Sequence, residues 1–387
     1  MRVLIISRYF WPEDGVSEEP YILKEYVDWH LSQGHKLKIV SGFQKHHMND
    51  LKKYTNLGVS FSYFFASIDR KSSFFRRIIN STILLTLACN SLIFKRKFDL
   101  IYTPSNPPLL ALFISIINKI FFKKSKIIFT IQDNMIYRFK NTLLKYIFKK
   151  YMKFAVVMSN IIIVLSKPMK EEIASYFSFK KSEKVLEKIH VLLNFSNLDK
   201  KYLKDGQVGA KNIDIIYAGN HGQSQDLISF LKILLQFNDN LPIIAFYGDG
   251  TQKSDVVNFS LENNLKINFY DPIPKKEILE VISKSKLGLV CMSESLSSYA
   301  FPSKLGTYLS VGTKVIICVN GHDNLNNYIK EKGFGYVIDS SDPKIAAENL
   351  KSYLLDIKNL NPSFYSNIVN EFDKEKYFKK LGKILEL

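Results

Sequence analysis

The stretch Phe301-Pro-Ser-Lys-Leu-Gly-Thr-Tyr-Leu-Ser-Val-Gly-Thr-Lys-Val-Ile316 joins a loop that carries one cation to a glycine-punctuated helix and a β-branched run. We expect the Pro-Ser pair to open the helix, with the Ser303 hydroxyl as its N-terminal cap, so that first-turn N–H groups and the helix dipole favour an anion. Lys304 adds a positive charge there, Gly312 ends the helix, and Val315–Val319 has the continuous apolar pattern of a buried parallel strand. The stretch therefore predicts a phosphate clamp beside the edge of a parallel sheet.

Apolar runs and helix-length segments alternate outward from this stretch through both halves of the chain, as in parallel α/β folds. The strands expected in the first half cover 2–7, 36–41, 100–103, 126–131 and 161–165, with a helix over 20–33 that ends at Gly34. Those expected in the second half cover 214–218, 243–247, 267–270, 287–292 and 314–319. The sequence thus predicts two doubly wound domains, 1–200 and 201–365, with a polar boundary near 197–212. Residues 362–387 are helical and amphipathic, and we expect the helix from 366 onward to pack back on the first domain.

Candidate ligand-binding loops follow these strands, because ligands of open parallel sheets bind beyond the carboxyl ends of the strands. In the first half the loops are 9–15, 103–108 and Gln132-Asp133. In the second half they are Gly219–Gly222 and Gly248–Gly250. We therefore expect the ligand in a cleft between the two domains.

The positive charge of the chain is concentrated in its first half. Of the 387 residues 46% are apolar, which supports globular folding, and the formal net charge is +18. Residues 1–200 hold 32 Lys and Arg against 15 Asp and Glu, whereas residues 201–387 hold 22 against 21. Basic and aromatic residues mix at 70–77, 95–97 and 121–126. Because these cations flank apolar runs, we favour an anionic membrane surface as partner, at about 1 kcal/mol per cation, over nucleic acid or a merely soluble basic surface.

Ile78–Phe94 is the candidate membrane segment. Its 17 residues are fewer than the roughly 20 of a spanning helix, and it contains Asn and Ser side chains. An interfacial helix between basic flanks fits better than a span, and a helix packed on its own domain fits equally well. Three cysteines without metal spacing, and an N-terminal apolar run too short for a signal peptide, indicate a cytoplasmic protein. We place it peripherally at the inner face of the plasma membrane.

Taken together, these motifs resemble the retaining glycosyltransferases of family 4, which have the GT-B fold, over nearly the whole chain. The residues that carry the resemblance are the opening strand with its aromatic-Pro-acidic-Gly loop, His35, 105–108, 131–133, 164–166, Asn194, 217–222, 248–250 and 301–316. The Gly-Asn-x-Gly loop with Gln225, the Gln-Asp pair and the Pro-Ser-Lys turn are most similar to the branch that builds O-antigen, capsule and colanic acid, including N-acetylfucosamine transferases.

The resemblance implies that the second domain binds a nucleotide diphosphate sugar and the first binds the acceptor. It also implies retention at the anomeric carbon, no cofactor and no obligatory metal; the sequence contains no Asp-x-Asp triplet. The residues assigned to the donor are Gly219, Asn220, Gly222, Gln225, Gly248, Asp249, Gly250, Ser303, Lys304 and Thr307. For the glycines, an ordinary turn is the alternative role.

Two departures from the family pattern change the expected charges. Asn220 and Gln225 are neutral where many members have an Arg and a Lys, so Lys304 is expected to carry more of the electrostatic stabilisation. Tyr299 and Thr307 stand where the family has two glutamates eight residues apart. Glu294 lies nearby and is either a substitute for them or a solvated carboxylate.

On the acceptor side, Asp133 is the candidate acceptor contact or general base, because it is an isolated acid after an apolar strand in a basic domain. A cap for the following helix is the alternative role, and the donor phosphate is another candidate base. Gly15, Val16 and Gln132 are assigned near the sugar or acceptor. His221 either reaches the donor or is an exposed loop residue.

The resulting hypothesis is a glycosyltransferase that passes a sugar from a nucleotide donor, most simply UDP-linked, to a polyprenyl-diphosphate-linked saccharide in bacterial capsule or O-antigen biosynthesis. The basic first half matches an anionic lipid head group. The alternatives are a nucleotide-sugar 2-epimerase of the same fold and a catalytically inactive scaffold of a polysaccharide-assembly complex. A nucleic-acid binder is a further alternative that we do not expect.

Overall fold

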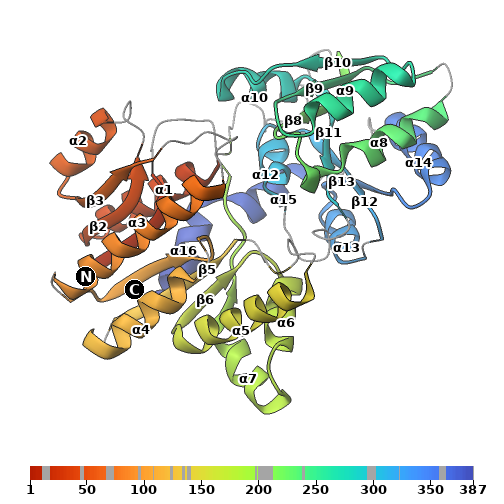
Figure 1. Cartoon of the computed structure of the whole chain (residues 1–387). Coiled ribbons are helices and arrows are strands. Elements are labelled where there is room, and N and C mark those ends of the chain that lie inside the picture. The colour runs from red at the N-terminus through yellow and green to blue at the C-terminus, as the bar shows by residue number, and fades with distance from the viewer. Residues whose placement is uncertain are drawn as a thin grey trace. The chain divides into compact units, whose positions relative to one another are not determined.

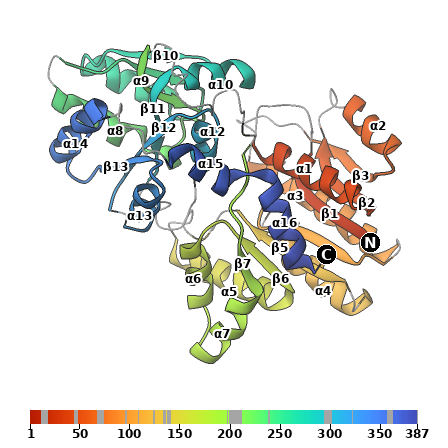
Figure 2. The same cartoon turned by 180° about the vertical axis from the view of Figure 1, so that it is seen from behind.

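The computed structural model describes residues 1–10, 18–43, 48–66, 74–94, 97–107, 109–122, 125–132, 136, 141–196, 198, 212–237, 240–293, 302–321, 323–356 and 363–386. The chain forms two compact units, Met1–Leu192 with Ile384–Leu387, and Leu193–Lys383. Each unit is a parallel sheet with helices packed on it (Figures 1 and 2). The chain leaves the first unit once and returns to it at its C-terminal end.

The first unit holds seven parallel strands in the order β3-β2-β1-β4-β5-β6-β7. The strands are β1 Arg2–Tyr9, β2 Lys36–Phe43, β3 Ser60–Phe65, β4 Leu100–Pro104, β5 Lys126–Ile131, β6 Ile161–Val164 and β7 Ile189–Val191. The helices are α1 Glu18–Ser32, α2 Met48–Asn56, α3 Phe74–Ile93, α4 Leu110–Phe122, α5 Thr142–Met158, α6 Lys167–Ser175 and α7 Phe179–Lys188. The five expected strands are confirmed. The two edge strands, β3 and β7, are not among the expected ones, because β3 is half exposed and β7 has only three residues.

Right-handed crossovers divide the helices of this unit between the two faces of its sheet. The chain moves from β1 to β3 toward one edge and from β4 to β7 toward the other. Crossovers of one hand therefore place α1 and α2 on one face and α3, α4 and α5 on the opposite face. In Figure 1, α3, α4 and α5 lie on the side of the sheet that is turned to the viewer.

The second unit holds six parallel strands in the order β10-β9-β8-β11-β12-β13. The strands are β8 Ile213–Ala218, β9 Ile244–Tyr247, β10 Ile267–Tyr270, β11 Ser285–Cys291, β12 Lys314–Val319 and β13 Gly335–Asp339. The helices are η3 Gln223–Gln225, α8 Leu227–Leu234, η4 Leu235–Phe237, α9 Lys253–Glu262, α10 Lys275–Ser283, α12 Ser303–Ser310, α13 Asp323–Lys332, α14 Pro343–Asp356, α15 Phe364–Phe372 and α16 Lys374–Leu385. All five expected strands are confirmed. The strand order reverses between β8 and β11, and such a switch point is where ligands of open α/β sheets bind.

Two local expectations are wrong. The N-cap of α12 is Pro302, which has extended backbone, and Ser303 is already the first helical residue, so the Ser303 hydroxyl is not the cap. Proline can hold the cap position because it has no N–H that needs a partner there. The expected C-terminal helix is two helices, α15 and α16, because Asp373 between them adopts extended backbone.

A helix that spans a lipid bilayer needs about 20 predominantly apolar residues. Among the described residues, no helix is both long enough and apolar enough to cross a membrane.

Candidate functional site

The loops that follow β8 and β9 pack backbone against backbone at the carboxyl ends of these strands. The N–H of Gly219 donates to the carbonyl oxygen of Tyr247 at 2.8 Å. A Cβ on Gly248 would lie 1.9 Å from the Gly219 oxygen, and one on Gly250 would lie 2.3 Å from the His221 oxygen. Gly219 and Gly248 also have positive φ angles, +145° and +144°. The contact between the two loops therefore requires glycine at both motifs, whether or not a ligand approaches.

Lys304, in the first turn of α12, reaches the end of β8. Its Nζ donates to Oη of Tyr217 at 3.1 Å and lies 4.8 Å from the centre of the Tyr217 ring. The Tyr217 hydroxyl in turn donates to the carbonyl oxygen of Asn220. A Cβ on Gly219 would lie only 2.4 Å from Cε of Lys304, so the glycine leaves the space that the lysine side chain occupies. The half-buried ammonium is thereby held beside the backbone of the Gly219 loop.

Tyr308 fixes α12 against the two strands of the switch point. Its buried hydroxyl accepts from the N–H of Ala218 at 2.9 Å and donates to the carbonyl oxygen of Leu289 at 3.1 Å. A Cβ on Gly288 would lie 2.4 Å from the Tyr308 ring, so this glycine lets the helix approach β11 closely. Burial raises the pKa of the Tyr308 hydroxyl, which keeps it protonated and able to donate. Tyr308 thus holds the first turn of α12, with Lys304, next to β8.

The neutral side chains of the Gly219 loop bind one another. Nδ2 of Asn220 and the N–H of Gly222 both donate to Oε1 of Gln225, each at 3.2 Å. A Cβ on Gly222 would lie 2.5 Å from the Asn220 amide, so Gly222 admits this contact. Asn220 and Gln225, which replace expected cations, therefore shape the loop between β8 and α8.

His221 is fully buried, so the expectation of an exposed loop histidine is wrong. Its ring packs between those of Tyr217 and Phe246, at centroid distances of 5.3 and 6.1 Å. Neither ring nitrogen has a hydrogen-bond partner among the residues that the structure describes. Burial, reinforced by the positive charges of Lys253 and Lys304, lowers the pKa of His221 to about 4. The imidazole is therefore neutral at pH 7.

The other donor-side residues lie on the same loops and helix. Ser303 is exposed, and Thr307 is half-buried one turn beyond it on α12. Asp249 is exposed, and its carboxylate accepts from the N–H of Gly250 at 2.8 Å, as in an ordinary turn. The structure thus gathers the assigned donor residues at the carboxyl ends of β8 and β9 and the start of α12.

The remaining assigned residues do not belong to the described loops and helix of the second unit. Gly15, Val16, Asp133, Glu294 and Tyr299 lie outside the described residues. Gln132 is half-buried just after β5, in the first unit. Within the segments that are described, no three His, Cys, Asp or Glu side chains gather in a way that would hold a metal ion.

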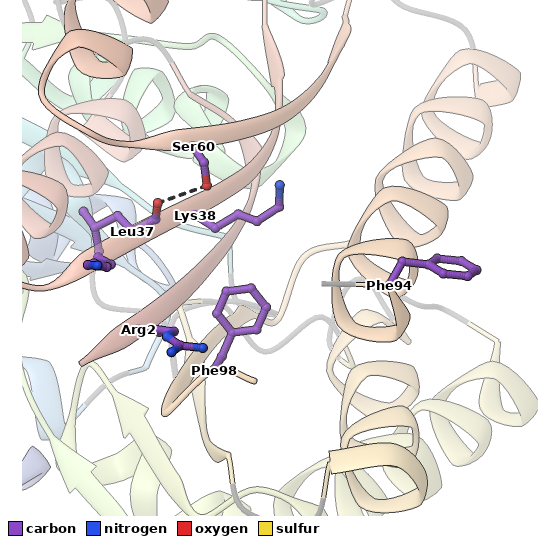
Figure 3. Close-up of a pocket in the computed structure, with 7 residues that line it drawn as sticks. Arg2, Leu37, Lys38, Ser60, Phe94 and Phe98 are labelled. Carbon is purple, nitrogen blue, oxygen red and sulfur yellow. Dashed lines mark hydrogen bonds between the residues drawn. The ribbon is translucent and has the colours of Figure 1, made fainter. Parts of the chain in front are cut away.

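A separate hollow of about 370 Å³ lies in the first unit, at the amino ends of its strands. It is lined by Arg2, Lys36, Leu37, Lys38, Ser60, Phe94 and Phe98 (Figure 3). The Ser60 hydroxyl, at the start of β3, donates to the carbonyl oxygen of Leu37 at 3.2 Å. The hollow lies at the opposite edge of its sheet from Gln132, which follows the carboxyl end of β5, so we do not include it in the candidate site.

The tyrosines of the site were not singled out in the sequence. Tyr217 is the penultimate residue of an expected strand, and Tyr308 is four residues beyond Lys304 on one helix face. The second spacing is visible in the sequence. Their partners, however, lie 87 and 90 residues away, so only the fold identifies their roles.

Comparisons with known proteins were made for the sequence and for the fold. No protein-family model and no curated protein sequence matches the chain. The solved apo structure of the lipopolysaccharide outer core galactosyltransferase WaaB is similar, with a TM-score of 0.63 and 14% identity over 100% of this chain and 99% of that one. Anabaena HepE in complex with UDP-glucose gives 0.62 and 12%, over 100% and 99%. The UDP-forming α,α-trehalose-phosphate synthase of Burkholderia vietnamiensis gives 0.69 and 9%, over the full length of both chains. These structures and the two parallel sheets identify the architecture as the GT-B fold.

Proposed function

We propose that the chain is a glycosyltransferase that uses a nucleotide diphosphate sugar, with UDP as the nucleotide. The observation that carries this proposal is the position of Lys304, held by Tyr217 beside the backbone of Gly219 at the switch point of the second sheet. A cation next to a glycine loop and a helix start suits a diphosphate. The fold supports the same conclusion, since HepE was solved with UDP-glucose and the trehalose-phosphate synthase is described as UDP-forming.

Lys304 would stabilise the charge that develops on the departing diphosphate. When the bond from the anomeric carbon to the phosphate oxygen breaks, negative charge grows on that oxygen, and a prepositioned ammonium lowers the energy of this state. The ammonium can exchange its hydrogen bond with the Tyr217 hydroxyl for a charge-assisted one to phosphate. From the resemblance to family 4 we add retention of anomeric configuration and independence from metal to the proposal.

We propose a polyprenyl-diphosphate-linked saccharide as the acceptor, in bacterial capsule or O-antigen assembly at the inner face of the plasma membrane. The excess of positive charge in residues 1–200 favours an anionic lipid-linked substrate. WaaB, one of the structural neighbours, is a transferase of the lipopolysaccharide outer core. Asp133 is proposed as the acceptor contact or base, and Gln132, Gly15 and Val16 are proposed as residues near the sugar or acceptor.

Calorimetric titration with UDP, followed by a screen of nucleotide sugars for hydrolysis with and without a synthetic lipid acceptor, tests this function. Lys304→Ala should weaken UDP binding by about 10- to 150-fold, because a charge-assisted hydrogen bond contributes about 1.5–3 kcal/mol. Lys284→Ala is the matched control, since Lys284 is an exposed lysine of the same unit paired with Glu280 on α10. Equal losses in both variants, or no UDP binding by the folded wild-type protein, would refute the proposal.

The same screen separates the alternatives. A sugar donor converted to its 2-epimer without an acceptor, detected by NMR, would identify an epimerase instead. UDP binding that depends on Lys304 without turnover of any donor would identify an inactive scaffold.

A further inference from the structure

Three neighbouring helices on one face of the first sheet lack acidic residues altogether. α3 packs beside α4, and α4 packs beside α5. In Figure 1 the three helices lie next to one another across the near side of the sheet. Together they carry seven Lys and Arg and no Asp or Glu. The surface formed by their outward sides, here the α3–α5 face, therefore carries charges of positive sign only.

α5 is apolar on two opposite sides. Its inner side buries Tyr151, Met152, Ala155 and Val156 against the sheet. Its outer side exposes a second set at helical spacing, namely Leu143, Ile147, Phe154 and Val157, which are 65, 48, 60 and 53% exposed. Soluble helices normally have a polar outer side, so a second apolar stripe indicates an apolar environment on that side.

The apolar stripe continues over the neighbouring helices. On α4, Phe113, Ile116 and Ile120 are exposed at intervals of three and four residues. On α3, Ile79, Ile83 and Ile93 are exposed along its length, and Phe94 follows at its end.

The two threonines of α3 form their side-chain hydrogen bonds within the helix. The hydroxyls of Thr82 and Thr86 donate to the carbonyl oxygens of Ile78 and Thr82, four residues earlier, at 3.0 Å each. A threonine bonded within its own helix loses less on transfer out of water than one bonded to solvent.

Lysines lie within and beside the apolar stripe of α5. Nζ of Lys150 lies 4.6 Å from the ring centre of Tyr146, and Nζ of Lys149 lies 4.9 Å from that of Tyr176. Nζ of Lys153 lies 5.8 Å from the ring centre of Phe177. Lysines that lay their stems along rings keep their charge at the polar edge of an apolar surface.

A second basic group lies at the end of α3. The hollow in Figure 3 is lined by the exposed Arg2 and Lys36 of the strand starts and by Phe94. The Phe94 ring is 80% exposed and points away from the strands (Figure 3). Apolar groups flanked by cations thus extend from α5 to the end of α3.

We infer that the α3–α5 face is the surface by which the protein docks on an anionic phospholipid membrane, with α5 lying in the boundary between head groups and acyl chains. A lipid surface is favoured over a protein partner because the apolar stripe crosses three helices and every charge on them has one sign, which complements an anionic leaflet. The inference specifies the membrane partner of the proposed function, adds α4 and α5 to the segment at α3 expected from the sequence, and does not depend on sugar transfer.

Flotation of the full chain with vesicles of phosphatidylglycerol and phosphatidylcholine, compared with phosphatidylcholine alone, tests this surface. We expect binding only to the anionic vesicles and a decrease with added salt. The double variant Ile147→Gln with Phe154→Gln should weaken vesicle binding at least tenfold. Replacement of Lys149, Lys150 and Lys153 by Gln should also weaken it at least tenfold, because each cation near the membrane contributes roughly fivefold to the binding constant. These side chains are exposed or half-buried, so the variants are expected to keep the wild-type melting temperature.

The matched control replaces Leu261 and Ile345, which are equally exposed but lie in the second unit, by Gln. Flotation of the α5 variants at the wild-type level, or an equal loss in the control, overturns the inference. So does binding of a second copy at this surface, seen as a dimer that the Phe154 variant dissociates while vesicle binding is unchanged. Calorimetry with UDP on the same samples separates the two proposals: if only the α5 variants stop floating and no form binds UDP, the docking surface stands and the proposed function fails.

Discussion

Replacement of Gly219 by alanine tests whether the contact between this glycine and Lys304 matters for ligand binding. The new Cβ would lie 2.4 Å from Cε and 3.0 Å from Nζ of Lys304, so the lysine must leave its position over Tyr217. The flexible end of the side chain moves readily, and the main stability cost is the backbone at φ +145°, about 1–3 kcal/mol. The displaced ammonium costs a further 1.5–3 kcal/mol in phosphate binding, which is about 10- to 150-fold in the Kd for UDP.

Gly321→Ala is the control for this experiment. Gly321 also has a positive φ, +65°, but a Cβ there would have no atom within 4 Å. Both variants should lose about 1–3 kcal/mol in chemical denaturation, because both place a side chain in a conformation that favours glycine. Only Gly219→Ala should weaken UDP binding in calorimetry. If the two folded variants bind UDP equally well, the position of Lys304 over the glycine does not serve phosphate binding.

Two further predictions concern buried groups of the same unit. His221 titrates near 6.5 when unfolded and at about 4 when folded, so below pH 6.5 the unfolded chain binds a proton that the folded chain excludes, and stability falls as the pH drops toward 4. Between pH 7 and pH 5 this loss is about 2 kcal/mol, and urea denaturation should show it in the wild type and much less of it in His221→Phe. Tyr308→Phe should lower the free energy of unfolding by about 1–3 kcal/mol, because it removes the hydrogen bonds to the Ala218 N–H and to the carbonyl oxygen of Leu289. Tyr336→Phe, which loses a bond to the exposed Asp356, should change it by less than 1 kcal/mol. An unchanged melting temperature in Tyr308→Phe would show that this hydroxyl does not hold α12.

The central strands of both sheets were predictable because burial on both faces leaves continuous apolar runs in the sequence. The edge strands β3, β7 and β13, which were not predicted, lack that signature, although the edge strand β10 was predicted. β3 has only half-buried and exposed residues, and β13 begins with a glycine and buries only Ile338. The helix start at α12 was predicted one residue late, since Ser303 has the chemistry of a cap but Pro302 has the backbone.

The residues of the candidate site likewise divide into those with a local sequence signature and those whose roles depend on the folded structure. Its glycines and Lys304 could be named from the sequence, because loops at strand ends and a cation at a helix start have local signatures. The burial of His221 could not, because it results from Phe246 and the Gly248 loop closing over it from another strand. The bonds of Tyr308 to two separate strands likewise exist only once the sheet has formed.

The loop that contains Asn220 and Gln225 has no charged side chain to add to Lys304, so its shape matters for how a diphosphate would be bound. Oε1 of Gln225 holds both the Asn220 amide and the Gly222 N–H, so the two residues that replace the expected cations fix the shape of the loop. A fixed loop and a lysine held between Tyr217 and Gly219 require little reorganisation when charge develops on a phosphate, and a prepositioned charge stabilises that state more than a mobile one. Position can therefore offset part of the missing charge. Gln225→Lys adds a cation to the loop but removes the oxygen that accepts from both Asn220 and Gly222. We therefore expect this variant to bind UDP more weakly in calorimetry, despite the added charge. Tighter binding in that variant would show that charge, not loop shape, limits the site.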